Sequence, residues 1–303
     1  MAHPFISLES KGLRERVATF VQSALHRTSA TNIIFVCGGD GAEHLRPQFI
    51  EFMKASMPSY RPFRPEAAQE DYFEQDHAES LNLSLFERLV SDLALGIVLF
   101  AESPGSYAET GLFSALPNAR RKTLVVMDAI HQGPGSFLSF GPVAVIASKS
   151  RLGAAIQLDY AKPNFEIIKE RVEGRLKVST TFRAIGATDF KQLKSIEIMS
   201  LIWFYVYFLR ACSVDDLIYC FHSAFNGHAR PVIIKQILSV LVGAGLVVRD
   251  GPLGLARIAD STVKLVAPSA AKTKQLEALE LEMTNLLEGE CDANYSEAMP
   301  HAA

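Results

Sequence analysis

Cysteine is scarce in this sequence of 303 residues. The four cysteines, Cys37, Cys212, Cys220 and Cys291, are dispersed and form no C-x-x-C pair. Cys220 lies two residues from His222, but no second pair of ligands accompanies them, so packing in a helix explains both. We therefore expect no metal site, and a protein of the reducing cytoplasm.

Apolar runs long enough to cross a membrane are also missing. The most apolar segment, 198–209, has about twelve residues, whereas a spanning helix needs about 20. The first residues lack the continuous apolar core of a signal peptide. The sequence thus predicts a buried core helix at 198–209 and no association with a membrane.

No excess of positive charge is present either. The formal net charge is −3, so the chain as a whole has no electrostatic footprint for nucleic acid. The apolar content of 49% is ample for a core. At about 100–200 residues for each domain, the length allows two domains.

The first half of the sequence does contain alternating strand and helix patterns. Continuous apolar runs typical of buried parallel strands lie at 33–37, 96–100, 122–128 and 143–147. Helical spacing lies at 13–25, 45–57 and 73–95, and the Pro-rich stretch 61–76 is expected to be a loop over a site, with short extended pieces. This alternation predicts an α/β fold with a doubly wound parallel sheet.

The run at 96–100 leads into a segment that carries chemistry. A turn of small residues is followed by Glu109 at the start of a helix. Ligands of open α/β sheets bind beyond the carboxyl ends of the strands, and free N–H groups at a helix start can hold phosphate oxygens. A carboxylate there suits cleavage of a glycosidic bond through an oxocarbenium-like centre. The alternative is that Glu109 only stabilises the positive end of the helix.

A second Gly-rich turn, 38–41, ends the run at 33–37. It is neither a Walker motif nor a full G-x-G-x-x-G motif, and it fits either a tight turn or contact with ribose hydroxyls. The candidate substrate-binding residues of the two turns are Gly38, Gly39, Asp40, Ser103, Gly105, Ser106 and Tyr107.

The segment 104–109 resembles the nucleoside 2-deoxyribosyltransferase superfamily, in which a Gly-rich turn leads to a catalytic Glu and an apolar helix. It is also similar to part of the Pro-Gly-Gly-x-Gly-Thr-x-x-Glu signature of phosphoribohydrolases. The resemblance implies a deoxyribosyltransferase-like catalytic domain at 1–186 with Glu109 as its catalytic residue. Ser106 and Ser103 stand three and six positions earlier, where true deoxyribosyltransferases have carboxylates that read the base. This departure argues against base exchange and leaves hydrolysis of another glycoside open.

The last third of the sequence changes character. Helical patterns at 190–210, at 213–222 and from 231 onward precede two short strands that flank 250–252. Three helices and a hairpin predict a winged helix-turn-helix domain at 187–267, followed by an acidic tail at 268–303. The third helix exposes little beyond Arg230, Lys235 and Gln236. These are too few side chains for sequence-specific contacts with base edges. We expect Arg230 and Lys235 to contact a nucleic acid backbone, or the domain to dock on a protein.

A deoxyribosyltransferase-like domain followed by a winged helix is similar to effector proteins of bacterial retrons. The resemblance implies an anti-phage effector that a reverse transcriptase and its msDNA hold inactive. It also implies hydrolysis of an N-glycosidic bond, with NAD as the substrate rather than a cofactor, and a homo-oligomer. The alternative is a nucleotide-sensing winged-helix regulator that binds DNA without catalysis.

Overall fold

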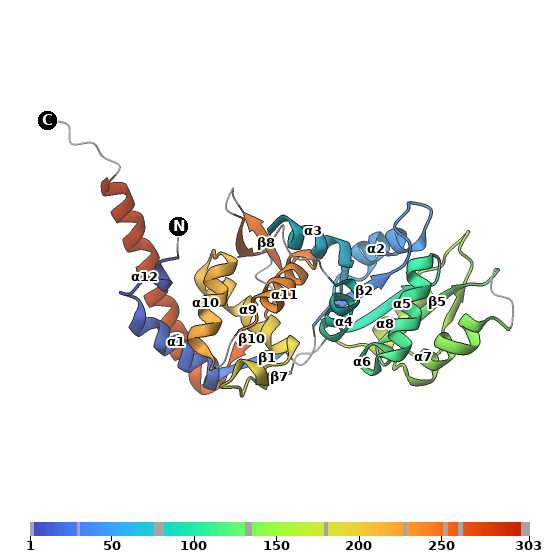
Figure 1. The fold of residues 1–303 in the computed structure, drawn as a ribbon, viewed down its shortest axis with the longest axis horizontal. Coiled ribbons are helices and arrows are strands. Elements are labelled where there is room, and N and C mark those ends of the chain that lie inside the picture. Colours follow the sequence, from blue (N-terminus) through green and yellow to red (C-terminus); the bar gives the residue numbers. More distant parts are fainter. Residues whose placement is uncertain are drawn as a thin grey trace. The chain divides into compact units, whose positions relative to one another are not determined.

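The computed structural model describes residues 3–28, 31–75, 82–130, 135–178, 181–226, 229–250, 254–259 and 263–297. Two compact units make up the chain (Figure 1): Ala30–Thr180 forms one, and Met1–Ser29 joins Thr181–Ala303 in the other. The domain boundaries expected from the sequence, 1–186, 187–267 and 268–303, remain predictions. They differ from the compact units mainly in where they assign the first 29 residues.

The unit Ala30–Thr180 is built on a five-stranded parallel sheet. Its strands are β2 (Ile33–Cys37), β3 (Arg61–Phe63), β4 (Gly96–Phe100), β5 (Thr123–Asp128) and β6 (Ile156–Leu158), paired in the order β3-β2-β4-β5-β6. The predicted α/β class with a parallel sheet is confirmed. The chain reverses its direction of travel across the sheet between β2 and β4, and such switch points are where open α/β sheets bind ligands.

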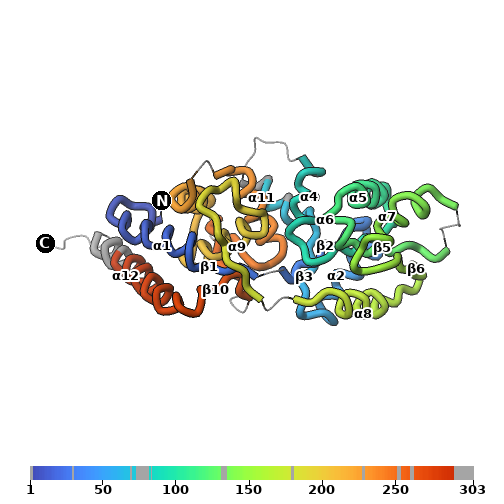
Figure 2. The backbone as a smooth tube through the Cα atoms, turned by 90° about the horizontal axis from the view of Figure 1, so that it is seen from below, coloured from blue at the N-terminus to red at the C-terminus, as the bar shows by residue number. Residues whose placement is uncertain are grey.

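Helices cover both faces of this sheet (Figure 2). Helices α2 (Leu45–Ser56) and α8 (Glu166–Arg175) lie on one face; α4 (Leu83–Leu93), α5 (Pro104–Ala115) and α7 (Ala144–Lys149) lie on the other, near α6 (Pro117–Arg120). Because successive residues of a strand point to opposite faces, Phe100 packs 5.4 Å from Phe49 of α2, while Phe35 packs 5.9 Å from Phe113 of α5. Both faces of the central strands are therefore core.

Two local predictions for this unit were wrong, and one strand was missed. Residues 143–147 are not a strand, because the π-helical turn η2 (Ser139–Val143) leads directly into α7. Ile146 is buried there and Val145 is 40% exposed, as expected for a helix that packs on one side only. The stretch 61–76 contains β3, one of the expected short extended pieces, but also the helix α3 (Pro65–Gln75) where a loop was expected, and β6 was not predicted.

The other unit has a helical centre. It contains α9 (Ser195–Leu209), α10 (Val214–Ala224) and α11 (Pro231–Gly243), followed by the antiparallel hairpin β8 (Val247–Asp250) and β9 (Leu255–Ile258). The tip of the hairpin, 251–253, lies outside the described residues. The three helices and two strands occur where the sequence predicted them, whereas the winged-helix assignment stays a prediction.

Both ends of the chain complete this unit. Helix α1 (Lys11–Ala24), which follows the short η1 (Pro4–Ile6), packs against α10 and α12 (Thr273–Glu297). Strand β1 (Leu25–Thr28) pairs with both β7 (Phe182–Ala184) and β10 (Val266–Pro268). The expected acidic tail thus contains the long helix α12.

The apolar segment 198–209 forms most of α9, and nearly all of its side chains are buried. A buried core helix was predicted there. Within the described ranges, none of the helices has both the length and the hydropathy that crossing a membrane would require.

Candidate functional site

Helix α5 presents Glu109 toward the protein interior. Pro104 is the first helical residue, so Glu109 lies in the second turn of α5. The sequence had suggested a position at the very start of the helix. Residues three or four apart share a helix face, and Ser106, Thr110 and Phe113 on that face are buried. Glu109 thereby lies on the same side of the sheet as Cys37, the last residue of β2.

The environment of Glu109 disfavours its charged form. Burial, followed by the nearby carboxylates Glu87 and Glu66, raises the pKa of Glu109 to about 8; Arg46 and a hydrogen bond with the Cys37 thiol act in the opposite direction. Its Oε2 is buried and has no hydrogen-bond partner within the described part of the chain. A carboxylate that stabilised a helix terminus would have a lowered pKa and lie in the first turn. The observed surroundings therefore favour a functional role over helix stabilisation.

Arg46 is the cation nearest to this cluster and its side chain is only 4% exposed. It donates to Glu66 Oε1 at 2.7 Å and also to Asp40 Oδ1, while Arg64 lies 3.7 Å from Asp40. A buried guanidinium requires such partners because the loss of its hydration is costly. Asp40, predicted to contact a ribose, is thus an ion-pair partner of two arginines in this structure.

Glu102 fills the anion site that α2 offers. Its carboxylate accepts hydrogen bonds from the backbone N–H groups of Gly39 (3.0 Å), Leu45 (2.8 Å) and Arg46 (3.2 Å). Unpaired N–H groups at a helix start are a common site for phosphate, but here a side chain of the protein occupies them. A Cβ atom on Gly38 would lie 2.6 Å from Glu102 Oε1. The first Gly-rich turn is therefore packed against Glu102.

Ser103 and Ser106 hold the turn before α5. The Ser103 hydroxyl accepts from the Ser106 N–H at 3.2 Å, and the Ser106 hydroxyl accepts from the N–H groups of Glu102 (3.0 Å) and Ser103 (2.9 Å). This reciprocal pattern is a capping box. Gly105 is exposed. The predicted substrate contacts of these three residues remain predictions.

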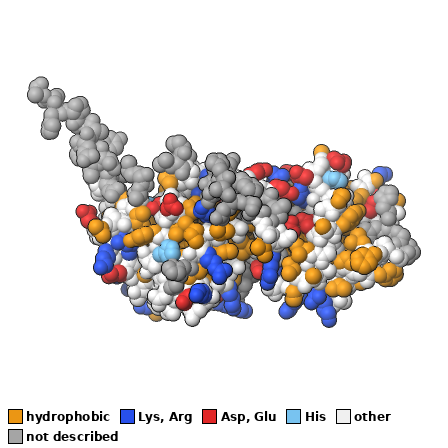
Figure 3. Space-filling view, viewed as in Figure 1, with side chains coloured by type: hydrophobic (Ala, Val, Ile, Leu, Met, Phe, Trp, Pro, Cys, Tyr) orange, Lys and Arg blue, Asp and Glu red, His pale blue; other side chains and the backbone are white. Residues whose placement is uncertain are grey.

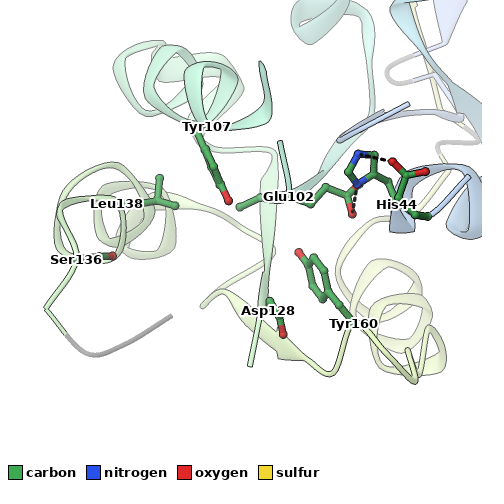
Figure 4. A pocket seen from close by; sticks show the side chains of 9 residues that line it. His44, Glu102, Tyr107, Asp128, Ser136, Leu138 and Tyr160 are labelled. Atoms are coloured by element: carbon green, nitrogen blue, oxygen red, sulfur yellow. Dashed lines mark ion pairs between the residues drawn. The ribbon is translucent and has the colours of Figure 1, made fainter. Parts of the chain in front are cut away.

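A cavity of about 390 Å³ opens at the carboxyl ends of β4, β5 and β6 (Figure 4). It is lined by Glu43, His44, Ala101, Glu102, Tyr107, Asp128, Ser136, Leu138 and Tyr160. Tyr107 is the one predicted site residue in this lining, and Glu109 is not part of it. The switch point therefore has this cavity, and the side-chain cluster around Glu109 lies outside the cavity lining.

Several residues of the cavity and of the cluster around Glu109 were not predicted. Arg46, Glu66 and Glu87 come from α2, α3 and α4, and no motif marks them in the sequence. Asp128 and Tyr160 were missed as well; Asp128 ends β5 and Tyr160 lies two residues after β6. The position of Asp128 at the end of an apolar run was a signal that could have identified it, whereas no such run precedes Tyr160.

The two predicted nucleic-acid contacts belong to the other unit. Arg230 is exposed just before α11 and Lys235 is half-buried on that helix. Arg230 lines a cavity of about 230 Å³ together with Lys191, Ser195 and apolar residues. Over the described ranges no group of three His, Cys, Asp or Glu residues could hold a metal ion.

Comparison with known proteins gives one curated relative in Escherichia coli, described as "Retron Ec86 putative ribosyltransferase/DNA-binding protein". It is 39% identical over 115 residues, which are 37% of this chain and 36% of the relative. The match thus spans about a third of the relative's length. The family described as STM3845 retron effector protein matches residues 42–249, from the turn before α2 to β8. Since this match covers more than half of the sequence, the chain belongs to the STM3845 retron effector protein family.

Proposed function

We propose that this chain is a retron effector that cleaves an N-glycosidic bond and hydrolyses NAD to nicotinamide and ADP-ribose, with NAD as substrate and not as a cofactor. The observation that carries the proposal is the Glu109 carboxyl group, buried beside the switch point with Oε2 unpaired among the described residues. The description of the Escherichia coli relative as a putative ribosyltransferase supports the same class of reaction.

The raised pKa of Glu109 suggests how it would act. With its pKa raised to about 8, the carboxyl group is largely protonated at neutral pH before substrate binds. A cationic nicotinamide, or positive charge that develops on the anomeric carbon, favours the carboxylate form. Substrate binding would then release the proton and leave an anion facing the oxocarbenium-like centre. Nicotinamide leaves as a neutral molecule, so the reaction needs no separate general acid.

The proposed partners are a retron reverse transcriptase and its msDNA, which would restrain the enzyme. Helices α9 to α11 and the hairpin β8–β9 would form the predicted winged helix-turn-helix, with Arg230 and Lys235 contacting phosphates. The name of the Escherichia coli relative includes DNA-binding protein, which supports nucleic acid as a partner.

Self-association is part of the same proposal. Figure 3 shows hydrophobic side chains gathered on the viewed face of the α/β unit, over α5 and α7. The large exposed apolar residues of this unit include Ile130 (68% exposed), Phe137 (88%), Phe140 (72%) and Val145 (40%). Contiguous exposed apolar surface marks protein contacts, and a second copy of this chain is the partner we propose.

Glu109→Gln tests the enzymatic proposal because it preserves shape and removes the titrating group. We expect cells that express the parent to lose NAD, and NAD hydrolysis by the purified variant to fall at least about 100-fold. Glu166→Gln, on the exposed side of α8, is the matched control and should behave as the parent. Full hydrolysis and toxicity in Glu109→Gln would exclude this role. Nucleoside levels measured in the same cells show whether another glycoside is consumed.

The competing candidate is a nucleotide-sensing regulator that binds duplex DNA and lacks catalysis. The exposed start of α11 and the adjoining hairpin favour it. It predicts sequence-selective duplex binding with a steep dependence on salt, and unchanged NAD and nucleoside levels.

A further inference from the structure

The 390 Å³ cavity has the position and size of a small-molecule site. Ala101 and Glu102 follow β4, Asp128 ends β5 and Tyr160 follows β6, so three neighbouring strands direct their carboxyl ends toward it. The crevice beyond the carboxyl ends of parallel strands is the general ligand site of open α/β sheets. The volume also lies in the range of such pockets, about 300–1,000 Å³.

Glu102 connects this cavity to the first turn of α2. The Glu102 side chain lines the cavity while its oxygens accept from the backbone N–H groups of Leu45 and Arg46. The side chain of Arg46 reaches instead to Glu66 and thus belongs to the cluster around Glu109. Since Glu109 is not in the cavity lining, a ligand bound in the cavity must extend beyond it to reach Glu109.

The lining combines aromatic rings with carboxylates. In Figure 4 the side chains of Tyr107 and Tyr160 point toward a common space, with Asp128 below it. The Tyr160 hydroxyl donates to Val126 O at 2.9 Å, which fixes that ring in place. Burial and then the nearby Glu102, Asp128 and Tyr107 raise the pKa of Tyr160, as expected in a field of negative sign.

Cations are scarce in the same lining. The described residues around the cavity include no Lys or Arg. The imidazole of His44 lies 3.5 Å from Glu43 and 3.9 Å from Glu102, so a positive charge on it is already compensated. Among the described lining residues a phosphate would meet carboxylates and no Lys or Arg, whereas an aromatic base can stack on tyrosine rings and a carboxylate can accept from ribose hydroxyls.

We propose that this cavity binds the adenosine half of the dinucleotide and selects against a 2′-phosphate on its ribose. The inference rests on the proposed function, since it assigns the adenosine part of NAD to this cavity. Asp128 is the residue we assign to the ribose hydroxyls, because a carboxylate at a strand end is the usual partner of an unphosphorylated ribose. Tyr107 is assigned to the base, and this residue is 45% exposed.

The test uses the full chain with Glu109→Gln, so that no ligand is consumed, and measures binding of adenosine and of adenosine 2′-monophosphate by calorimetry. We expect adenosine to bind at least tenfold more tightly than the 2′-phosphate. Asp128→Asn should weaken adenosine binding at least fivefold and reduce that ratio. Tyr107→Ala should also weaken adenosine binding, and Tyr107→Phe, which keeps the ring, should not.

Asp159→Asn is the matched control. Asp159 accepts from the Ala161 N–H at 2.9 Å, just as Asp128 accepts from the Ile130 N–H at 3.0 Å, but it does not line the cavity. Asparagine can keep either hydrogen bond, so both variants should fold, and their melting temperatures check this. Equal weakening by Asp128→Asn and Asp159→Asn overturns the inference, as does equal affinity for adenosine and adenosine 2′-monophosphate or no saturable adenosine binding.

Hydrolysis of NAD and NADP by the parent separates this inference from the proposed function. Cleavage of both dinucleotides at the same rate supports the glycohydrolase and overturns the assignment of the cavity. Selective adenosine binding that depends on Asp128, without any cleavage of NAD, supports the cavity and contradicts the proposed function.

Discussion

The Glu102 carboxylate accepts a 2.8 Å hydrogen bond from the backbone N–H of Leu45, 57 residues earlier in the chain. The same carboxylate also accepts hydrogen bonds from the N–H groups of Gly39 and Arg46, and the Glu102 side chain is 4% exposed. One acidic side chain thus fastens the turn after β4 to the first turn of α2. The two loops of the switch point cannot move independently while this contact persists.

Glu102→Gln should lower the free energy of unfolding by about 1–3 kcal/mol, because an amide lacks the negative charge and has only one acceptor oxygen. Urea titration followed by circular dichroism measures the change. Glu51→Gln, whose parent side chain is 71% exposed, is the control and should change stability little. Equal stability of the two variants would show that the anchoring contact contributes nothing.

Gly38→Ala should destabilise the protein by about 1–3 kcal/mol, since an added Cβ would meet Glu102 Oε1 at 2.6 Å and Arg46 Cβ at 2.8 Å. Gly111→Ala is a matched control on α5, where an added Cβ meets nothing within 4 Å. Its expected effect is a gain of up to about 1 kcal/mol from helix propensity. Thermal unfolding of both variants gives the comparison, and a neutral Gly38→Ala would mean that the turn adapts easily.

Glu109→Gln should become more stable than the parent as pH rises. The pKa of Glu109 is raised to about 8 in the folded protein from an ordinary value of 4.5, so the folded state holds a proton that the unfolded chain loses. The stability that this proton contributes is complete below pH 4.5, falls by at most about 1.4 kcal/mol per pH unit above it, and is lost beyond pH 8. Melting temperatures of parent and variant from pH 5 to 9 should therefore diverge, and parallel curves would contradict the raised pKa.

The pH dependence of NAD hydrolysis should reveal which form of Glu109 acts. If the carboxylate faces the developing cation, kcat/KM rises with pH and levels off above about pH 8. Glu87→Gln removes the largest charge that raises the pKa of Glu109, so the midpoint of the rise should move to lower pH. Activity that instead falls above pH 8 would indicate that Glu109 donates a proton to the leaving group.

Much of the α/β unit was predictable from local pattern. Continuous apolar runs at 33–37, 96–100 and 122–128 identified three central strands, because strands buried on both faces must be apolar throughout. The run at 143–147 has the same composition but forms a helix, since short apolar runs do not distinguish the two structures. Strand β6 escaped notice because its central residue, Gln157, is exposed.

The candidate site was predictable only in part. Glu109 could be identified as a candidate catalytic residue because it follows a strand and a turn of small residues. The expected resemblance to retron effectors is confirmed by the family match. The residues that surround Glu109 could not be predicted, because Arg46, Glu66 and Glu87 come from three different helices that only the folded sheet brings together. Sequence spacing has no information on such long-range approach.

The position of β1 between β7 and β10 has a consequence for synthesis of the protein on the ribosome. Residues 25–28 are translated long before β10, which begins at Val266, so the sheet cannot close until Val266 and the residues after it have emerged. The unit Ala30–Thr180 has no such delay, because all of its strands are present once residue 158 is made. Domains tend to fold in the order in which they leave the ribosome. The half that contains Glu109 is thus ready to fold while the other half still awaits its last strand.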